Sequence, residues 1–218
     1  MKKNYKSYLS NRRFVLSCIV SIAFLALAFV TNYYASVYAT DSASNPVNDI
    51  ILSNIPVFDV DGIFVFGPFI FWAFIFLLCV HRPQRVPFLA KSIAIFVIIR
   101  AGFVTLTHIG PFPYQVPINY NSDWIWWLSQ GGDLFFSAHT GLPYLMALIF
   151  GALNKWYFYI FTAVAVFFGI VVLLGHLHYS IDVAAAFFIT YSIYSIAIRW
   201  FKKDKEIFEK GLPALPTD

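Results

Sequence analysis

Long apolar runs separated by short polar segments dominate the pattern of this chain. A helix that crosses the hydrocarbon core of a bilayer needs about 20 mostly apolar residues. Pro143 lies in the first turns of the shortest run, where proline is tolerated because the first N–H groups of a helix lack partners. The pattern predicts an all-α membrane protein, a six-transmembrane-helix bundle with short loops. The predicted spans are residues 14–39, 62–80, 88–108, 138–153, 156–176 and 179–201.

Composition supports a membrane protein. Of the 218 residues, 60% are apolar and 12% are charged, whereas a soluble domain is about half apolar and about a quarter charged. We predict a basic cytoplasmic N-terminus at 1–13, one membrane domain at 14–201 and a cytoplasmic tail at 202–218. The first run also resembles a signal peptide, but its apolar part is longer than usual, so we predict that it is retained.

The basic residues predict the orientation. Lys and Arg precede the first span, flank the link between the second and third, separate the fourth from the fifth and close the chain. Loops 40–61 and 109–137 contain none. Because cytoplasmic loops carry the excess of Lys and Arg, both termini are predicted to be cytoplasmic. The basic pI therefore reflects topology, and we expect no nucleic-acid partner and infer no obligate protein partner.

Two histidine motifs begin spans at the predicted outer face. His178 and Asp182 are four residues apart, so they share one helix face, and the carboxylate can orient the imidazole. His178 would then be a nucleophile and His139 a general acid. Ser137 and Thr140 add hydroxyl donors at a helix N-terminus, where free N–H groups favour phosphate. This set predicts phosphoryl transfer through a phosphohistidine.

Three further polar residues are candidate substrate-binding groups. Arg100 lies inside the third span and needs a partner, either a substrate phosphate or a carboxylate. His108, at the outer end of that span, belongs either to the site or to the membrane interface. Asp133 either orients a site group or caps the fourth helix. The candidate carboxylate partners of Arg100 are Asp59, Asp61 and Asp182.

A metal site is the alternative use of the second motif. His176, His178 and Asp182 are residue types that bind zinc. However, residues two apart on a helix point in different directions, so His176 is predicted to lie at the edge of the loop. We therefore expect no metal and no other cofactor.

The two motifs resemble the sphingomyelin synthase-related family of the type-2 phosphatidic acid phosphatase superfamily. GDLFFSAHT (132–140) and HLHYSIDVAAAFFIT (176–190) are similar to its Gly-Asp-x3-Ser-Gly-His-Thr and His-Tyr-Thr-x-Asp-Val-x2-Ala patterns. Ala138 stands in place of Gly, and Ser180 in place of Thr. The resemblance implies that His178 is the nucleophile, Asp182 its orienting group and His139 the acid/base partner.

The resemblance also implies a reaction. That family moves a phosphocholine or phosphoethanolamine headgroup from a glycerophospholipid to ceramide without a metal. Phosphatases of the superfamily resemble one another in two motifs, Lys-x6-Arg-Pro and a Ser-Arg pair before the nucleophilic histidine. This chain has Val171-Val172 at the position of the Ser-Arg pair. A phosphomonoester favours bidentate arginine clamps, so Arg100 alone fits a phosphodiester better.

We therefore predict a lipid phosphotransferase that acts between membrane lipids as donor and acceptor. The alternative is a lipid phosphatase or a phospholipase C-like hydrolase, in which water attacks the intermediate. A third class is a non-catalytic lipid-binding or transport protein. The compact chain indicates a bacterial inner-membrane protein with its site on the outer face.

Overall fold

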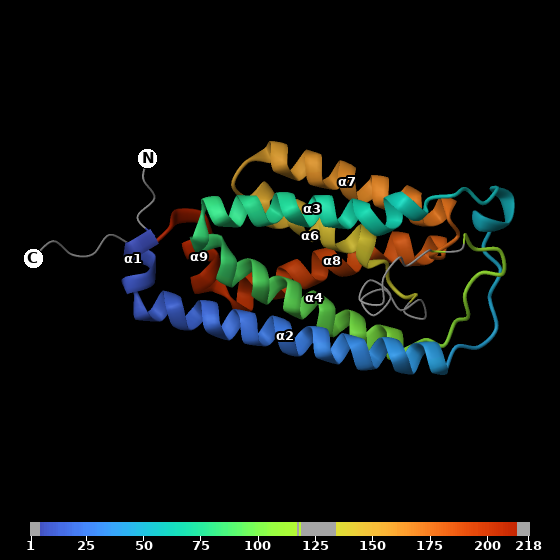
Figure 1. Cartoon of the computed structure of the whole chain (residues 1–218), viewed down its shortest axis with the longest axis horizontal. Coiled ribbons are helices and arrows are strands. Elements are labelled where there is room, and N and C mark those ends of the chain that lie inside the picture. The colour runs from blue at the N-terminus through green and yellow to red at the C-terminus, as the bar shows by residue number, and fades with distance from the viewer. Residues whose placement is uncertain (1–4, 117, 119–133, 213–218) are drawn as a thin grey trace, which may run out of the picture.

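The computed structural model describes residues 5–116, 118 and 134–212. Within these ranges every regular element is helical, and the helices run side by side along the long axis (Figure 1). The elements are α1 (Tyr5–Ser10), α2 (Arg12–Asp41), η1 (Leu52–Asn54), α3 (Asp61–His81), η2 (Pro83–Arg85), α4 (Val86–Leu106), α6 (Ala138–Gly151), α7 (Lys155–Leu174), α8 (Ser180–Trp200) and α9 (Lys202–Lys210).

Five segments of the described chain are long and apolar enough to cross a membrane. They are α2, α3, η2 together with α4, α7 and α8, and they correspond to five of the six predicted spans. The predicted fourth span forms α6, which has only 14 residues. At 1.5 Å per residue it is about 21 Å long, shorter than the roughly 30 Å hydrocarbon core. By this criterion the described residues contain five candidate spans, and α6 occupies the position of the predicted fourth span without reaching that length.

The buried position of α6 explains its short length. The preceding segment 134–137 is not helical, and Leu134, Phe136 and Ser137 within it are buried. Non-helical backbone at membrane depth is tolerated where protein surrounds it. On α6 itself, Leu145 and Met146 are fully buried. This helix therefore packs inside the bundle, mainly against α7 and α8.

The central helix of the bundle is α4. It packs along α2 and contacts α6, α8 and α9, and most of its residues are buried. Apolar side chains of α4 and α6, with Phe136, form the main core. In contrast, α3 packs mainly against α7 and η2, so it is the most loosely attached of the long helices.

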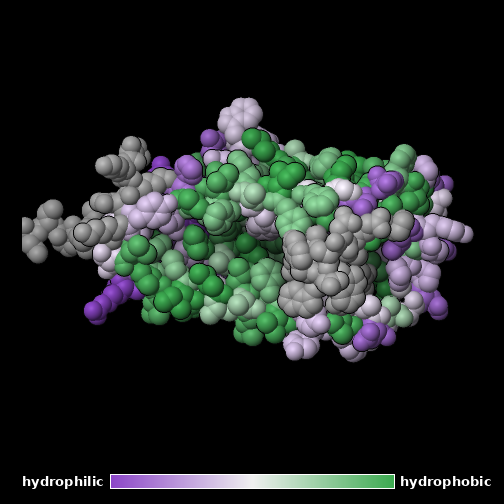
Figure 2. All heavy atoms as spheres, in the orientation of Figure 1, coloured by the Kyte–Doolittle hydropathy of each residue, from purple (hydrophilic) through white to green (hydrophobic). Residues whose placement is uncertain are grey.

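The outer surface is apolar along the helices and hydrophilic toward both ends (Figure 2). Large side chains such as Ile70, Phe76 and Phe188 are more than two-thirds exposed. Such contiguous apolar surface marks contact with lipid rather than water. The long apolar helices and this surface indicate an integral membrane protein.

A buried ion pair joins α9 to the rest of the bundle. Lys91 Nζ in α4 lies 2.6 Å from Asp204 Oδ2 in α9 and donates to Ser17 Oγ in α2 at 2.9 Å. The Ser17 hydroxyl in turn donates to Asp204 Oδ1 at 2.6 Å. The predicted first span thus supplies a polar partner that the buried Lys91 uses. This network holds the C-terminal helix against α2 and α4.

We predict that Lys91→Ala lowers the free energy of unfolding in detergent by about 3 kcal/mol, because it leaves the Asp204 charge buried and unpaired. The measurement is chemical unfolding of purified protein followed by tryptophan fluorescence. Lys205→Ala is the control, because the partly exposed Lys205–Glu209 pair should contribute about 1 kcal/mol or less. Equal losses in the two variants would contradict the assignment.

Candidate functional site

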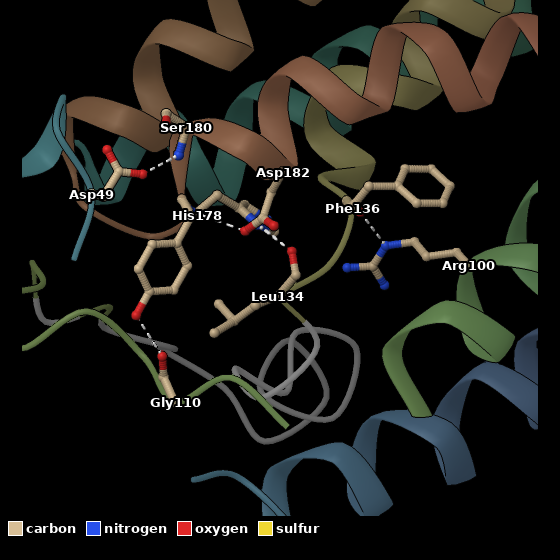
Figure 3. A network of polar contacts seen from close by, with 9 residues as sticks. Asp49, Arg100, Gly110, Leu134, Phe136, His178, Ser180 and Asp182 are labelled. Carbon is tan, nitrogen blue, oxygen red and sulfur yellow. Dashed lines mark hydrogen bonds and ion pairs between the residues drawn. The ribbon is translucent and has the colours of Figure 1, made fainter. Parts of the chain in front are cut away.

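The imidazole of His178 is held by a backbone carbonyl. Its Nδ1 lies 2.8 Å from the oxygen of Leu134, in the segment before α6 (Figure 3). A carbonyl oxygen can only accept, so Nδ1 carries the hydrogen and donates it. In the neutral ring this leaves the lone pair on Nε2. With a residue exposure of 7%, His178 is buried with a defined tautomer.

Asp182 has two roles at the start of α8. Its Oδ2 accepts the N–H of Tyr179 at 2.9 Å and lies 3.4 Å from His178 Nδ1. The predicted pairing of His178 with Asp182 is therefore present, but the Leu134 carbonyl is the closer acceptor. The other oxygen, Oδ1, is buried and has no hydrogen-bond partner among the described residues. Asp182 thus caps the helix and places negative charge beside the imidazole.

The N-terminus of α6 lies against this pair. The backbone N–H of Ser137 donates to the carbonyl oxygen of Asp182 at 3.3 Å. Ser137 is the N-cap residue, but its side chain makes no capping hydrogen bond. Within the described chain, Ser137 Oγ and Thr140 Oγ1 are buried without a hydrogen-bond partner. Unused donors at a helix N-terminus favour an anion such as phosphate.

His139 lies in the first turn of α6 and packs between two aromatic rings. Its imidazole stacks on Phe64 of α3, with ring centroids 4.2 Å apart and planes 24° apart. Phe168 of α7 meets it edge-on at 6.2 Å. These contacts hold the ring among apolar groups, on the side of the helix that faces α3 and α7.

Arg100 anchors the segment before α6. Its Nε donates to the carbonyl oxygen of Phe136 at 2.8 Å (Figure 3), and the residue is 95% buried. The sequence left open a substrate phosphate or a carboxylate as partner, whereas the Nε hydrogen bond goes to a backbone carbonyl, two residues from the one that His178 uses. Arg100 therefore places its charge beside the segment that connects to α6.

The remaining candidates from the sequence are His108, Asp133 and His176. His108 is exposed, with its ring against Tyr38 and its carbonyl accepting from Ser44, near the C-terminal end of α2. Asp133 lies outside the described residues. His176 is buried in the left-handed conformation, with φ 54° and its ring edge-on to Phe112. The described chain contains no group of three His, Cys, Asp or Glu residues arranged to hold a metal ion.

Asp49 is a site residue that sequence reasoning missed. Its Oδ2 accepts the N–H of Ser180, the first residue of α8, at 2.7 Å, and Oδ1 accepts from Ile51 and Leu52 (Figure 3). Burial raises the pKa of this carboxyl, but these hydrogen bonds outweigh it and hold the pKa below its usual range. The acidic residue fits a local cap of η1, so the sequence offered no signal of a contact with α8.

Tyr179 completes the connection between the loops at this end of the bundle and α8. Its hydroxyl donates to the carbonyl oxygen of Gly110 at 2.7 Å and accepts the N–H of Val47 at 3.2 Å. Together with Asp49, it ties two loops to the turn that carries His178.

Residues 130–199 match the family model described as PAP2 superfamily C-terminal. The match spans less than half of the chain, but it includes His139, His178 and Asp182. It confirms the predicted resemblance at the level of the superfamily and indicates a lipid phosphatase or phosphotransferase. Neither the comparison with curated proteins nor that with solved structures found a match.

We predict that Asp49→Ala lowers both the free energy of unfolding and turnover. The substitution removes the acceptor of the Ser180, Ile51 and Leu52 N–H groups. Leaving N–H groups without a partner costs about 1–3 kcal/mol, and the start of α8 is released. Chemical unfolding and initial rates measure the two effects. Asp59→Ala is the control, because Asp59 is exposed and accepts only locally, from Asp61.

The pH dependence of this effect has a defined sign. Because the folded-state pKa is lowered, the stabilisation by Asp49 is complete above the ordinary value of about 3.9 and is lost as the pH falls through the lowered pKa. The stability difference between wild type and Asp49→Ala should thus stay constant from about pH 5 to 8. A difference that vanishes toward pH 5, or equal behaviour of Asp49→Ala and Asp59→Ala, would refute the assignment.

Proposed function

We propose that this protein is a lipid phosphotransferase that carries a phospho-headgroup on Nε2 of His178. The observation that carries the proposal is the buried hydrogen bond from His178 Nδ1 to the Leu134 carbonyl, because it leaves Nε2 as the nucleophilic nitrogen. The buried hydroxyls of Ser137 and Thr140, which lack partners in the described chain, offer donors for the phosphoryl oxygens.

In the first step, Nε2 attacks phosphorus and the bond between phosphorus and the lipid oxygen breaks. His139 gives its proton to that oxygen, so a neutral lipid alcohol leaves. Positive charge develops on the His178 ring as the N–P bond forms. The carboxylate of Asp182, 3.4 Å from Nδ1, stabilises this charge.

In the second step, an acceptor hydroxyl attacks the phosphohistidine. His139, now neutral, takes the hydroxyl proton as the O–P bond forms and the N–P bond breaks. His178 returns to its neutral form, so atoms and charge balance over the cycle. Attack by a lipid hydroxyl gives headgroup transfer, whereas attack by water gives hydrolysis.

The charges around the site favour a phosphodiester donor. Arg100 contributes one buried positive charge beside the segment before α6, and its Nε already donates to the Phe136 carbonyl. A phosphomonoester carries up to two charges and favours bidentate clamps, whereas a diester carries one. A phosphocholine or phosphoethanolamine headgroup, as the sequence resemblance implies, fits this balance.

We place the site at the outer face of the membrane. Helices α1 and α9 lie at one end of the bundle, and η1 and the start of α3 lie at the other (Figure 1). The Lys- and Arg-rich segments adjoin the first end, and the loop that holds Asp49 has none. By the positive-inside rule, the end that carries His178 is extracytoplasmic.

We predict that His178→Ala abolishes transfer and the phosphoenzyme. Purified protein in liposomes of phosphatidylcholine, phosphatidylethanolamine, ceramide and diacylglycerol is incubated with donor labelled at phosphorus. In wild type, label should appear on an acid-labile phosphohistidine and then on a second lipid. His81→Ala, at an exposed position near the other end of α3, should behave as wild type.

Two outcomes would separate the alternatives. Release of only water-soluble phosphate or phosphoryl headgroup would favour the hydrolase. Headgroup binding that survives His178→Ala, with no turnover in wild type, would favour the non-catalytic class and overturn the proposal.

The role of His139 as general acid gives a further prediction. His139→Ala should slow phosphoenzyme formation from a lipid donor by about 10²–10⁴-fold. It should spare most of the rate with p-nitrophenyl phosphocholine, because nitrophenolate leaves without a proton. Quenched-flow labelling measures both rates. Equal losses with the two donors would show that His139 is not the acid.

A further inference from the structure

An apolar pocket reaches His139 from the side of the bundle. Its walls come from α3 (Pro68, Phe71, Trp72), α6 (Leu142, Pro143) and α7 (Phe168), and its volume is about 170 Å³. Among the described residues that line it, His139 is the single titratable group. Apolar side chains of the pocket therefore lie next to His139, the acid/base of the proposed mechanism.

Aromatic side chains lie against the His139 imidazole. Phe64 covers one face of the imidazole and Phe168 meets it edge-on. Pro68 lies one turn further along α3, so the aromatic contact continues into the pocket wall. An engineered apolar cavity of about 150 Å³ stays free of water and binds benzene. The pocket is therefore large enough for a short hydrocarbon segment, and its mostly apolar lining offers water few hydrogen-bond partners.

The position of the pocket connects it to the bilayer. It lies beside α3, the long helix that packs least closely against the bundle, and the apolar surface is hollowed along α3 in Figure 2. A hydrocarbon chain that starts in the pocket can leave it into lipid. A whole chain does not fit in 170 Å³, so only the segment next to the polar group is enclosed.

The surroundings of His178 are polar, unlike the apolar pocket beside His139. His178 lies beside the Leu134 carbonyl and the Asp182 carboxylate, and the backbone carbonyl of Asp182 accepts the N–H of Ser137. The site thus has polar groups beside the proposed nucleophile, whereas aromatic rings and an apolar pocket lie beside the proposed acid/base.

From this division we infer that the pocket binds the hydrocarbon segment adjoining the hydroxyl of a lipid alcohol. The inference rests on the proposed function. In the first step the oxygen that His139 protonates belongs to that alcohol, and P–O cleavage leaves the headgroup on His178. In the second step His139 accepts the proton of a second lipid alcohol whose chain occupies the same pocket. Because water lacks a chain to fill it, the pocket favours transfer over hydrolysis.

The test fills the pocket. Leu142→Trp should raise KM for dioctanoylglycerol as acceptor by about tenfold or more, the scale by which a hydrophobic pocket discriminates a changed apolar group. Phosphoenzyme formation from p-nitrophenyl phosphocholine should change little, because this donor has no chain. The ratio of hydrolysis to transfer should therefore rise.

The matched control is Leu77→Trp, the same substitution on the lipid-facing surface of α3, where Leu77 is 54% exposed. It should leave acceptor KM and the hydrolysis ratio unchanged. If Leu142→Trp slows the nitrophenyl donor as much as the lipid acceptor, or leaves acceptor KM unchanged, the pocket assignment is wrong.

A second measurement uses the unmodified protein, so it does not depend on the folding of a variant. A diacylglycerol with a diazirine close to its ester is photolysed in liposomes, and the labelled peptides are identified by mass spectrometry. We expect labels on the segments of α6 and α7 that contain Leu142 and Phe168. Because α3 also lines the pocket, labels confined to helices other than α3, α6 and α7 would overturn the inference.

The outcomes distinguish the inference from the proposal on which it rests. Absence of a phosphoenzyme in wild type would reject the proposed function and the inference with it. A phosphoenzyme on His178 that transfers its headgroup, together with unchanged acceptor KM in Leu142→Trp, would reject only the role of the pocket.

Discussion

The site depends on how the non-helical backbone between 134 and 137 satisfies its hydrogen bonds inside the bundle. Water does not reach the bilayer core, so buried carbonyls there need protein donors. Leu134 accepts from His178, and Phe136 accepts from Arg100. These two bonds hold the segment between α4 and α8. The same bonds that stabilise the fold also select the tautomer of His178 and bring the start of α6 against Asp182.

His139 and His178, the two histidines of the proposed mechanism, have different surroundings. His178 is held by polar groups, and loops anchored through Asp49 and Tyr179 lie over the start of its helix. His139 is held by aromatic rings beside an apolar pocket. A reaction between the headgroup of one lipid and the hydroxyl of another needs both environments, because its reactants are polar at one end and apolar at the other.

The sequence was most informative where its residues are local partners. The spacing of His178 and Asp182 predicted their contact, and the long apolar runs predicted five helices that the structure contains. The predicted fourth span also forms a helix, α6, which has only 14 residues because the segment before it is not helical. The partner of Arg100 could not be chosen, since any nearby carboxylate, phosphate or backbone carbonyl satisfies a guanidinium. Asp49 was missed because its acceptor role joins residues 131 apart.

The sequence alone thus determined the membrane class, the helices and the identity of the paired groups at the start of α8. Those features follow from hydrophobicity and from short spacing along the chain, which are properties of neighbouring residues, although His178 itself precedes α8. Only the tertiary structure decided which nitrogen of His178 is free, which carbonyls hold the site and that an apolar pocket adjoins His139. These features depend on contacts between helices, and the packing of side chains that creates them has no signature in the local sequence.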